Sequence, residues 1–219
     1  MNIKILVVDD HGILREGLRL LIGQQEDMEM IAEAADGREA VELVRKLKPN
    51  VVLMDISMPG LNGVEATRQI TKENPSTKVL ALSAYSDKRF VTDSLKAGAS
   101  GYILKDSLTD ELVRAIYAVM ADERYLCPKA AAIVVDDYIH AGQSESAEPL
   151  LLDRLTGKER ELLQLLVENK SSKEAARLLH VSVKTVDARR RDLMNKLGIS
   201  GIAELTKFAI REGLTSLEF

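Results

Sequence analysis

The sequence lacks the features of a disulfide-rich, exported or membrane-spanning protein. Its 219 residues include one cysteine, Cys127, so no intrachain disulfide can form, and a reducing compartment, the cytoplasm, is the expected location. No segment approaches the roughly eighteen consecutive apolar residues of a membrane-spanning helix. The apolar run near the start is too short, and too soon followed by two aspartates, for a signal peptide.

Two nucleotide-binding signatures are also missing. No G-x-G-x-x-G follows the first apolar segment, and no G-x-x-x-x-G-K-[ST] occurs anywhere in the sequence. Rossmann and P-loop nucleotide sites are therefore disfavoured. Hydrophobic residues make up 46% of the chain, which is enough for a substantial core in one or two domains.

Charge is distributed unevenly along the chain. Residues 154–219 carry 13 Lys and Arg against 9 Asp and Glu, whereas residues 1–153 carry 17 against 25. An acidic front and a basic rear predict two modules with different partners. The basic module suits a polyanion such as nucleic acid.

Short apolar segments alternate with helical stripes in the first part of the chain. The expected strands are 3–8, 28–34, 51–54, 78–83 and 102–104. This alternation predicts an α/β doubly wound, five-stranded parallel sheet in a domain spanning residues 1–122. Residues 123–150 are expected to form a helical extension over 128–139 and then a linker, because 140–149 lacks periodicity.

The rear segment, residues 151–219, is expected to form an all-α domain. A short helix at 173–179, a tight connection and a longer helix at 183–197 fit a helix-turn-helix motif. Three helix starts carry capping signatures: Ser107 with Asp110, Thr156 with Glu159, and Ser171 with Glu174.

The front module is organised around an apolar run at 51–54 that ends directly in Asp55. Asp9 and Asp10 follow the first strand. Because the carboxyl ends of parallel strands share one edge of a sheet, these three carboxylates should lie close together. Carboxylates that crowd in this way require a cation or raised pKa values, and an all-oxygen set with few protein ligands suits Mg²⁺.

Two more polar residues end strands at the same edge, Ser83 and Lys105. A hydroxyl and an ammonium around a carboxylate–Mg²⁺ centre predict a phosphoryl-transfer site with Asp55 as the nucleophile. Lys105 would balance charge on the phosphoryl oxygens. Taken alone, Asp9 and Asp10 are better explained as a solvated turn, and Lys105 as a surface lysine. Only the occurrence of all these residues at one edge of the sheet favours a phosphoryl-transfer site over these simpler interpretations.

Residues 1–122 resemble the receiver domain of bacterial two-component response regulators. The resemblance rests on four motifs in order, at 7–11, 55–63, 81–84 and 98–105. It implies that Asp55 accepts a phosphoryl group from the phosphohistidine of a sensor histidine kinase. It also implies that the protein is not an enzyme beyond its own Mg²⁺-dependent phosphotransfer and autodephosphorylation.

The same resemblance assigns the metal ligands. The side chains of Asp10 and Asp55 would hold Mg²⁺, the backbone carbonyl of Ser57 would be a third ligand, and Asp9 would act through water. His11, which follows the acidic pair, is expected to be non-catalytic.

A switch pair is implied as well, formed by Ser83 and Tyr102. Ser83 would move to the phosphoryl group and Tyr102 would turn inward behind it, changing the surface of the fourth helix, fifth strand and fifth helix. On its own, Tyr102 is better explained as a core aromatic with a solvated hydroxyl.

The helix at 183–197 can be phased by its apolar stripe, which should face the core: Val186, Leu193, Met194 and Leu197. The residues expected to reach base edges are Asp187, Ala188 and Arg191. Their chemistry suits cytosine N4, a thymine methyl group, and guanine O6 with N7, respectively. The residues expected to contact phosphates are Lys184, Thr185, Arg189 and Lys196.

This rear segment resembles the LuxR-type C-terminal domain of the NarL/FixJ subfamily, through motifs at 155–161, 173–176, 181–186 and 194–198. The resemblance implies sequence-specific binding to double-stranded DNA by a homodimer that forms on phosphorylation, with the helix at 202–210 as a contact surface. Two residues depart from the family pattern. Arg189 stands where His is usual, and Ala175 stands where a larger aliphatic residue is common, a difference of about 1 kcal/mol per methylene of packing.

The combined expectation is a transcription regulator controlled by phosphorylation of Asp55. Two alternatives stay open. One is a constitutive DNA-binding protein whose front module acts mainly through protein contacts. The other is a Mg²⁺-dependent phosphohydrolase of similar topology, which generally needs a second Asp two positions after the nucleophile, where this chain has Ser57.

Overall fold

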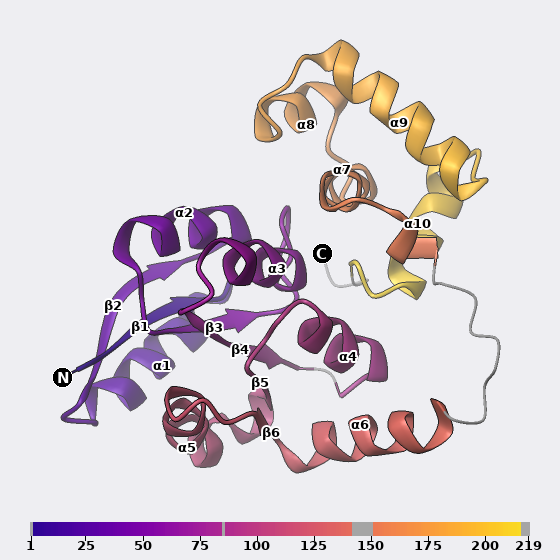
Figure 1. The fold of residues 1–219 in the computed structure, drawn as a ribbon. Coiled ribbons are helices and arrows are strands. Elements are labelled where there is room, and N and C mark those ends of the chain that lie inside the picture. The colour runs from indigo at the N-terminus through magenta and orange to yellow at the C-terminus, as the bar shows by residue number, and fades with distance from the viewer. Residues whose placement is uncertain (1, 85, 142–150, 216–219) are drawn as a thin grey trace. The chain divides into compact units, whose positions relative to one another are not determined.

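The computed structural model describes residues 2–84, 86–141 and 151–215. The chain divides into two compact units, Met1–Gln143 and Ser144–Phe219 (Figure 1). Most of the predicted linker, from residue 142 onward, lies outside the described residues. In the described part of the chain, no helix has the length and apolar character needed to cross a membrane.

The first unit alternates strands and helices. Its strands are β1 (Ile3–Val8), β2 (Met28–Ala34), β3 (Val51–Asp55), β4 (Lys78–Ser83), β5 (Gly101–Leu104) and β6 (Tyr125–Leu126). Its helices are α1 (Gly12–Gly23), α2 (Gly37–Leu47), α3 (Gly63–Glu73), α4 (Lys88–Lys96), α5 (Leu108–Met120) and α6 (Pro128–Ala141), with a 3₁₀ turn, η1 (Lys105–Ser107), before α5.

The strands form one parallel sheet in the order β2-β1-β3-β4-β5-β6. This confirms the doubly wound α/β class, but the predicted count of five strands is corrected to six. The additional strand, β6, has two residues, and Tyr125 and Leu126 pair with Gly101 and Tyr102 of β5. A strand this short carries no periodic pattern, so only its tertiary pairing reveals it.

Helices cover both faces of the sheet. Helices α1 and α5 pack on one face, and α2, α3 and α4 lie on the other (Figure 1). Successive residues of β1 alternate between the two cores, with Ile5 and Val7 in one and Leu6 and Val8 in the other. The near-continuous apolar runs follow from burial on both faces.

Helix α6 is part of the first unit. Its residue Ala130 is buried in a cluster with Val91 of α4, Tyr102 of β5 and Cys127. The predicted helical extension therefore forms, and it packs against α4 and the sheet edge.

The second unit is helical, as predicted. It consists of a 3₁₀ turn, η2 (Leu151–Arg154), and the helices α7 (Gly157–Val167), α8 (Ser172–Leu178), α9 (Val183–Leu197) and α10 (Ile202–Arg211). Its core comes from all four helices and includes Ala175, one of the two departures noted above.

Two of the three predicted helix caps are confirmed. Thr156 and Ser171 each complete a capping box with the glutamate three residues on. Ser107 is different, because its hydroxyl donates to the backbone carbonyl of Leu104 and makes no capping bond. The 3₁₀ turn before α5 occupies the place where the sequence pattern predicted a simple helix start.

Candidate functional site

The acidic residues meet at the carboxyl edge of the sheet. Val8 of β1 pairs with Met54 of β3, so Asp9 and Asp55, which follow these residues, lie side by side. Both side chains are almost fully buried, at 0% and 1% exposure. Two carboxylates are thus held close together with little access to water, as the strand order predicted.

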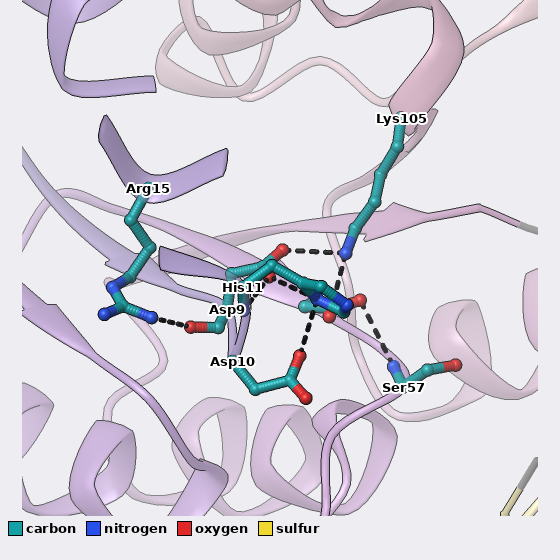
Figure 2. A network of polar contacts seen from close by, with 7 residues as sticks. Asp9, Asp10, His11, Arg15, Ser57 and Lys105 are labelled. Carbon is teal, nitrogen blue, oxygen red and sulfur yellow. Dashed lines mark hydrogen bonds and ion pairs between the residues drawn. The ribbon is translucent and has the colours of Figure 1, made fainter. Parts of the chain in front are cut away.

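Lys105 links these two carboxylates. It is the first residue of η1, directly after β5, and its Nζ lies 2.7 Å from Asp9 Oδ2 (Figure 2). The same Nζ lies 2.9 Å from Asp55 Oδ2. The opposite oxygen of Asp55, Oδ1, accepts a hydrogen bond from the backbone N–H of Ser57 at 3.2 Å. The sequence prediction that these three residues share one site is consistent with this geometry.

The surroundings of Asp55 destabilise the ionised form of its carboxyl group. Burial, with a further contribution from the charge of Asp9, raises the pKa of Asp55 to about 6, against the opposing effects of Lys105 and the Ser57 amide. Burial would lower the pKa of Lys105, but the charges of Asp55 and Asp9 and their hydrogen bonds raise it overall. One ammonium therefore does not fully compensate the pair, and an additional cation would stabilise the ionised state.

The raised pKa makes a prediction for the metal-free protein. Asp55 holds its proton more readily when folded, so its contribution to stability is complete below about pH 4 and is lost as the pH rises through about 6. Asp55→Asn should thus raise the free energy of unfolding at about pH 8 by about 2–3 kcal/mol, and should change it little at about pH 4. Urea titrations in EDTA measure the difference, and an equal gain at both pH values would contradict the linkage.

A cluster around the two buried carboxylates could hold a metal ion. Ligand atoms of Asp9, Asp10, His11 and Asp55 all lie within 4.8 Å of one another. Asp9 Oδ2 and Asp55 Oδ2 are both buried, and both face the single Lys105 ammonium. Buried oxygens of this kind are suited to a hard cation.

Two residues outside the predicted site set also contact the acidic pair. His11, set aside as non-catalytic, has its Nδ1 3.1 Å from Asp9 Oδ1 and 2.9 Å from Asp10 Oδ1. Arg15 donates from Nη1 to the backbone carbonyl of Asp9 at 2.6 Å (Figure 2). The available signals were the adjacency of His11 to the acidic pair and the position of Arg15 in the next helix.

The predicted switch pair is buried next to the site. Ser83 ends β4 and is 1% exposed, while Tyr102 of β5 is fully buried. Burial raises the pKa of the Tyr102 hydroxyl well above its usual value, and a hydrogen bond with Ser83 opposes this shift. Tyr102 already occupies the inward position, in contact with the cluster that contains α4 and α6 residues.

In the second unit, α9 presents the predicted polar face. Val186, Leu193 and Leu197 are buried, whereas Lys184 and Arg191 are exposed. Of the remaining predicted DNA contacts, Asp187 and Lys196 are exposed, and Thr185, Ala188 and Arg189 are half-buried.

Two of the predicted DNA contacts already have partners within the domain. Lys196 Nζ lies 3.1 and 2.9 Å from the two carboxylate oxygens of Glu159 on α7. Asp187 Oδ1 accepts a 2.8 Å hydrogen bond from Ser172 Oγ on α8. Neither pairing is visible in the sequence, because the partners are 37 and 15 residues apart.

Comparison with known proteins matches both units. Residues 5–117 match the family described as Response regulator receiver domain, and residues 153–209 match Bacterial regulatory proteins, luxR family. Proteins named Oxygen regulatory protein NreC from Staphylococcus epidermidis and Staphylococcus aureus are 38% identical to this chain, over 99% of this chain and 100% of theirs.

Solved structures agree with these matches. A LuxR-family two-component response regulator from Aurantimonas sp. SI85-9A1 is 38% identical with a TM-score of 0.61, covering 64% of this chain and 99% of that one. RcsB from Salmonella enterica serovar Typhimurium, bound to promoter rprA with the phosphomimetic BeF₃⁻, is 25% identical with a TM-score of 0.59, covering 95% and 98%.

A parallel α/β domain with an acidic pocket, joined to a LuxR-type helical domain, defines a two-component response regulator. The chain belongs to the NarL/FixJ family of these proteins, and it is a DNA-binding response regulator.

Proposed function

We propose that Asp55 is the phosphoacceptor and that a sensor histidine kinase supplies the phosphoryl group. The observation that carries this proposal is the position of Asp55, which is buried beside Asp9 and within 2.9 Å of the Lys105 ammonium. Asp55 is the last residue of β3, at the carboxyl edge of the sheet, and Asp9 follows β1 beside it.

Asp55 would attack the phosphorus of the kinase phosphohistidine. The bond between the Asp55 oxygen and phosphorus forms as the phosphorus–nitrogen bond breaks, and the electron pair leaves with the imidazole. Lys105 would shift from the carboxylate pair toward the phosphoryl oxygens. The only chemistry expected of the chain itself is this transfer and the later hydrolysis of its acyl phosphate.

The donor set supports Mg²⁺ as the cofactor. The side chains of Asp10 and Asp55 and the Ser57 carbonyl would hold the ion, and Asp9 would act through water. When bound, Mg²⁺ would reduce the negative charge that the attacking carboxylate and the phosphoryl oxygens share.

Phosphorylation would act through the switch pair and favour a homodimer. Ser83 would move to the phosphoryl group and Tyr102 would be fixed in its inward position behind it, which would change the surface of α4, β5 and α5. Two copies of α9 would then read paired DNA half-sites. The RcsB structure, to which this chain is similar, contains promoter DNA and a phosphomimetic, and this similarity supports the proposal. A cytoplasmic location follows from the DNA partner.

The test compares DNA affinity and oligomeric state with and without beryllofluoride and Mg²⁺, at one salt concentration. A monomer-to-dimer shift with tighter binding is expected. Unchanged affinity and mass would instead favour the constitutive alternative, in which the receiver acts only through protein contacts.

Phosphohydrolase activity is the weaker alternative. The position two residues after the nucleophile is Ser57, whose hydroxyl is a poor general acid compared with a carboxyl group. Release of phosphate from small phosphomonoesters over many turnovers would support it.

The structure distinguishes the two lysines that were expected to contact phosphates. Lys184 is exposed near the start of α9, whereas Lys196 is held by Glu159. Lys184→Ala should reduce the slope of log affinity against log salt by about 0.9, and Lys196→Ala should change it much less. Equal reductions, measured by fluorescence anisotropy, would mean that the Glu159 pair opens on DNA.

A further inference from the structure

Asp187 is an unusual residue for a surface that binds DNA. It lies in the first half of α9, on the same face as Lys184 and Arg191, three and four residues away. A free carboxylate here would repel phosphates and weaken binding to any sequence. A role in selecting sequence or in holding the motif together would account for its presence.

The hydroxyl of Ser172 forms a hydrogen bond that orients the Asp187 side chain. Ser172 is the first residue of α8, and its Oγ donates to Asp187 Oδ1 across the turn between the helices at 2.8 Å. Within the described residues, no ion pair joins Asp187 to Lys184 or Arg191. The acidic side chain is thus oriented by the neighbouring helix and not by the cations beside it.

A carboxylate has more acceptor positions than this one bond uses. Oδ1 is engaged by Ser172, which leaves Oδ2 to accept from another donor. In the major groove, the donor that pairs with Asp or Glu is the amino group at N4 of cytosine. A hydrogen bond to one oxygen also reduces the freedom of a side chain that would otherwise rotate on the surface.

We propose that Ser172 is a positioning residue that orients Asp187, so that Asp187 reads the amino group of one cytosine in the binding site. This proposal rests on the proposed DNA-reading function of α9. It assigns a role in specificity to a residue of the first motif helix, which makes no base contact itself.

The chain offers a matched set of variants. Ser172→Ala removes the donor, Ser172→Thr keeps it, and Asp187→Asn alters the acceptor. Ser200→Ala is the control, because Ser200 is exposed between α9 and α10. None of these changes alters a cation, so the salt dependence that reports phosphate contacts should persist in Ser172→Ala.

The experiment selects binding sites from a random duplex pool, using the full chain with beryllofluoride and Mg²⁺ at fixed salt. The wild type should enrich cytosine at one position of each half-site. Asp187→Asn should lose that preference, and Ser172→Ala should reduce it about tenfold at the same position only. Ser172→Thr and Ser200→Ala should match the wild type.

Several outcomes overturn the inference. A Ser172→Ala profile equal to that of the wild type would show that Asp187 needs no positioning, and an equal loss at every position would show a purely structural role. If Asp187→Asn selects the same base preferences as the wild type, Asp187 does not recognise a base. If the wild type selects no sequence at all, the proposed DNA-reading function fails together with the inference, a result distinct from the others.

Discussion

Replacing Asp55 by Asn should abolish transfer of a phosphoryl group to the chain from acetyl phosphate with Mg²⁺. In the proposed reaction the carboxylate oxygen is the nucleophile, and a neutral amide of the same shape cannot replace it. The loss should be complete and not partial, because the proposal assigns the nucleophile to Asp55 alone. Asp9, the other carboxylate of the described residues that is buried beside Lys105, is expected to act on Mg²⁺ through water.

Intact-mass spectrometry after incubation measures this loss directly. Asp192→Asn is a suitable control, since Asp192 is an exposed carboxylate on α9 in the other unit. It should be phosphorylated to the wild-type extent. Labelling of Asp55→Asn at the wild-type rate would show that another residue is the acceptor, and peptide mapping would then identify it.

Gly63→Ala should destabilise the first unit more than any other single-methyl addition that the structure suggests. A Cβ at Gly63 would lie 1.9 Å from the backbone oxygen of Asp55, 2.8 Å from its carbonyl carbon and 2.9 Å from Ile56 Cα. These are backbone atoms at the end of β3 and just after it, and they cannot rotate away as the end of a side chain can. The destabilisation would come from these steric contacts and not from backbone strain, because the φ angle of Gly63 is not positive.

The expected loss is about 3 kcal/mol, at the upper end for overpacking, together with slower phosphorylation because Asp55 is displaced. Hydrogen exchange of peptides covering β3 reports the stability of the first unit specifically.

Gly17→Ala is the control, and its expected effect has the opposite sign. Its Cβ meets nothing within 4 Å in the middle of α1, so the free energy of unfolding should rise by up to about 1 kcal/mol. Equal effects of the two changes would refute the contact argument.

Local patterns in the sequence were sufficient to predict much of the fold. The apolar runs ending in Asp9, Asp55, Ser83 and Lys105 located four strand ends, and the parallel alternation placed those ends on one edge. The capping boxes of α7 and α8 were also readable, because their bonds span only three residues. The caps and the strand boundaries depend on residues near in sequence, so a linear pattern contains them, and the common edge follows from the general rule that parallel strands align.

The sequence by itself determined the class of protein, the acidic pocket and the polar face of α9. Only the tertiary structure decided which groups meet. It added β6 to the sheet and gave Asp187 and Lys196 partners on other helices. Hydrogen bonds and ion pairs between distant segments depend on side-chain directions that packing sets, and residue type and spacing alone do not encode those directions.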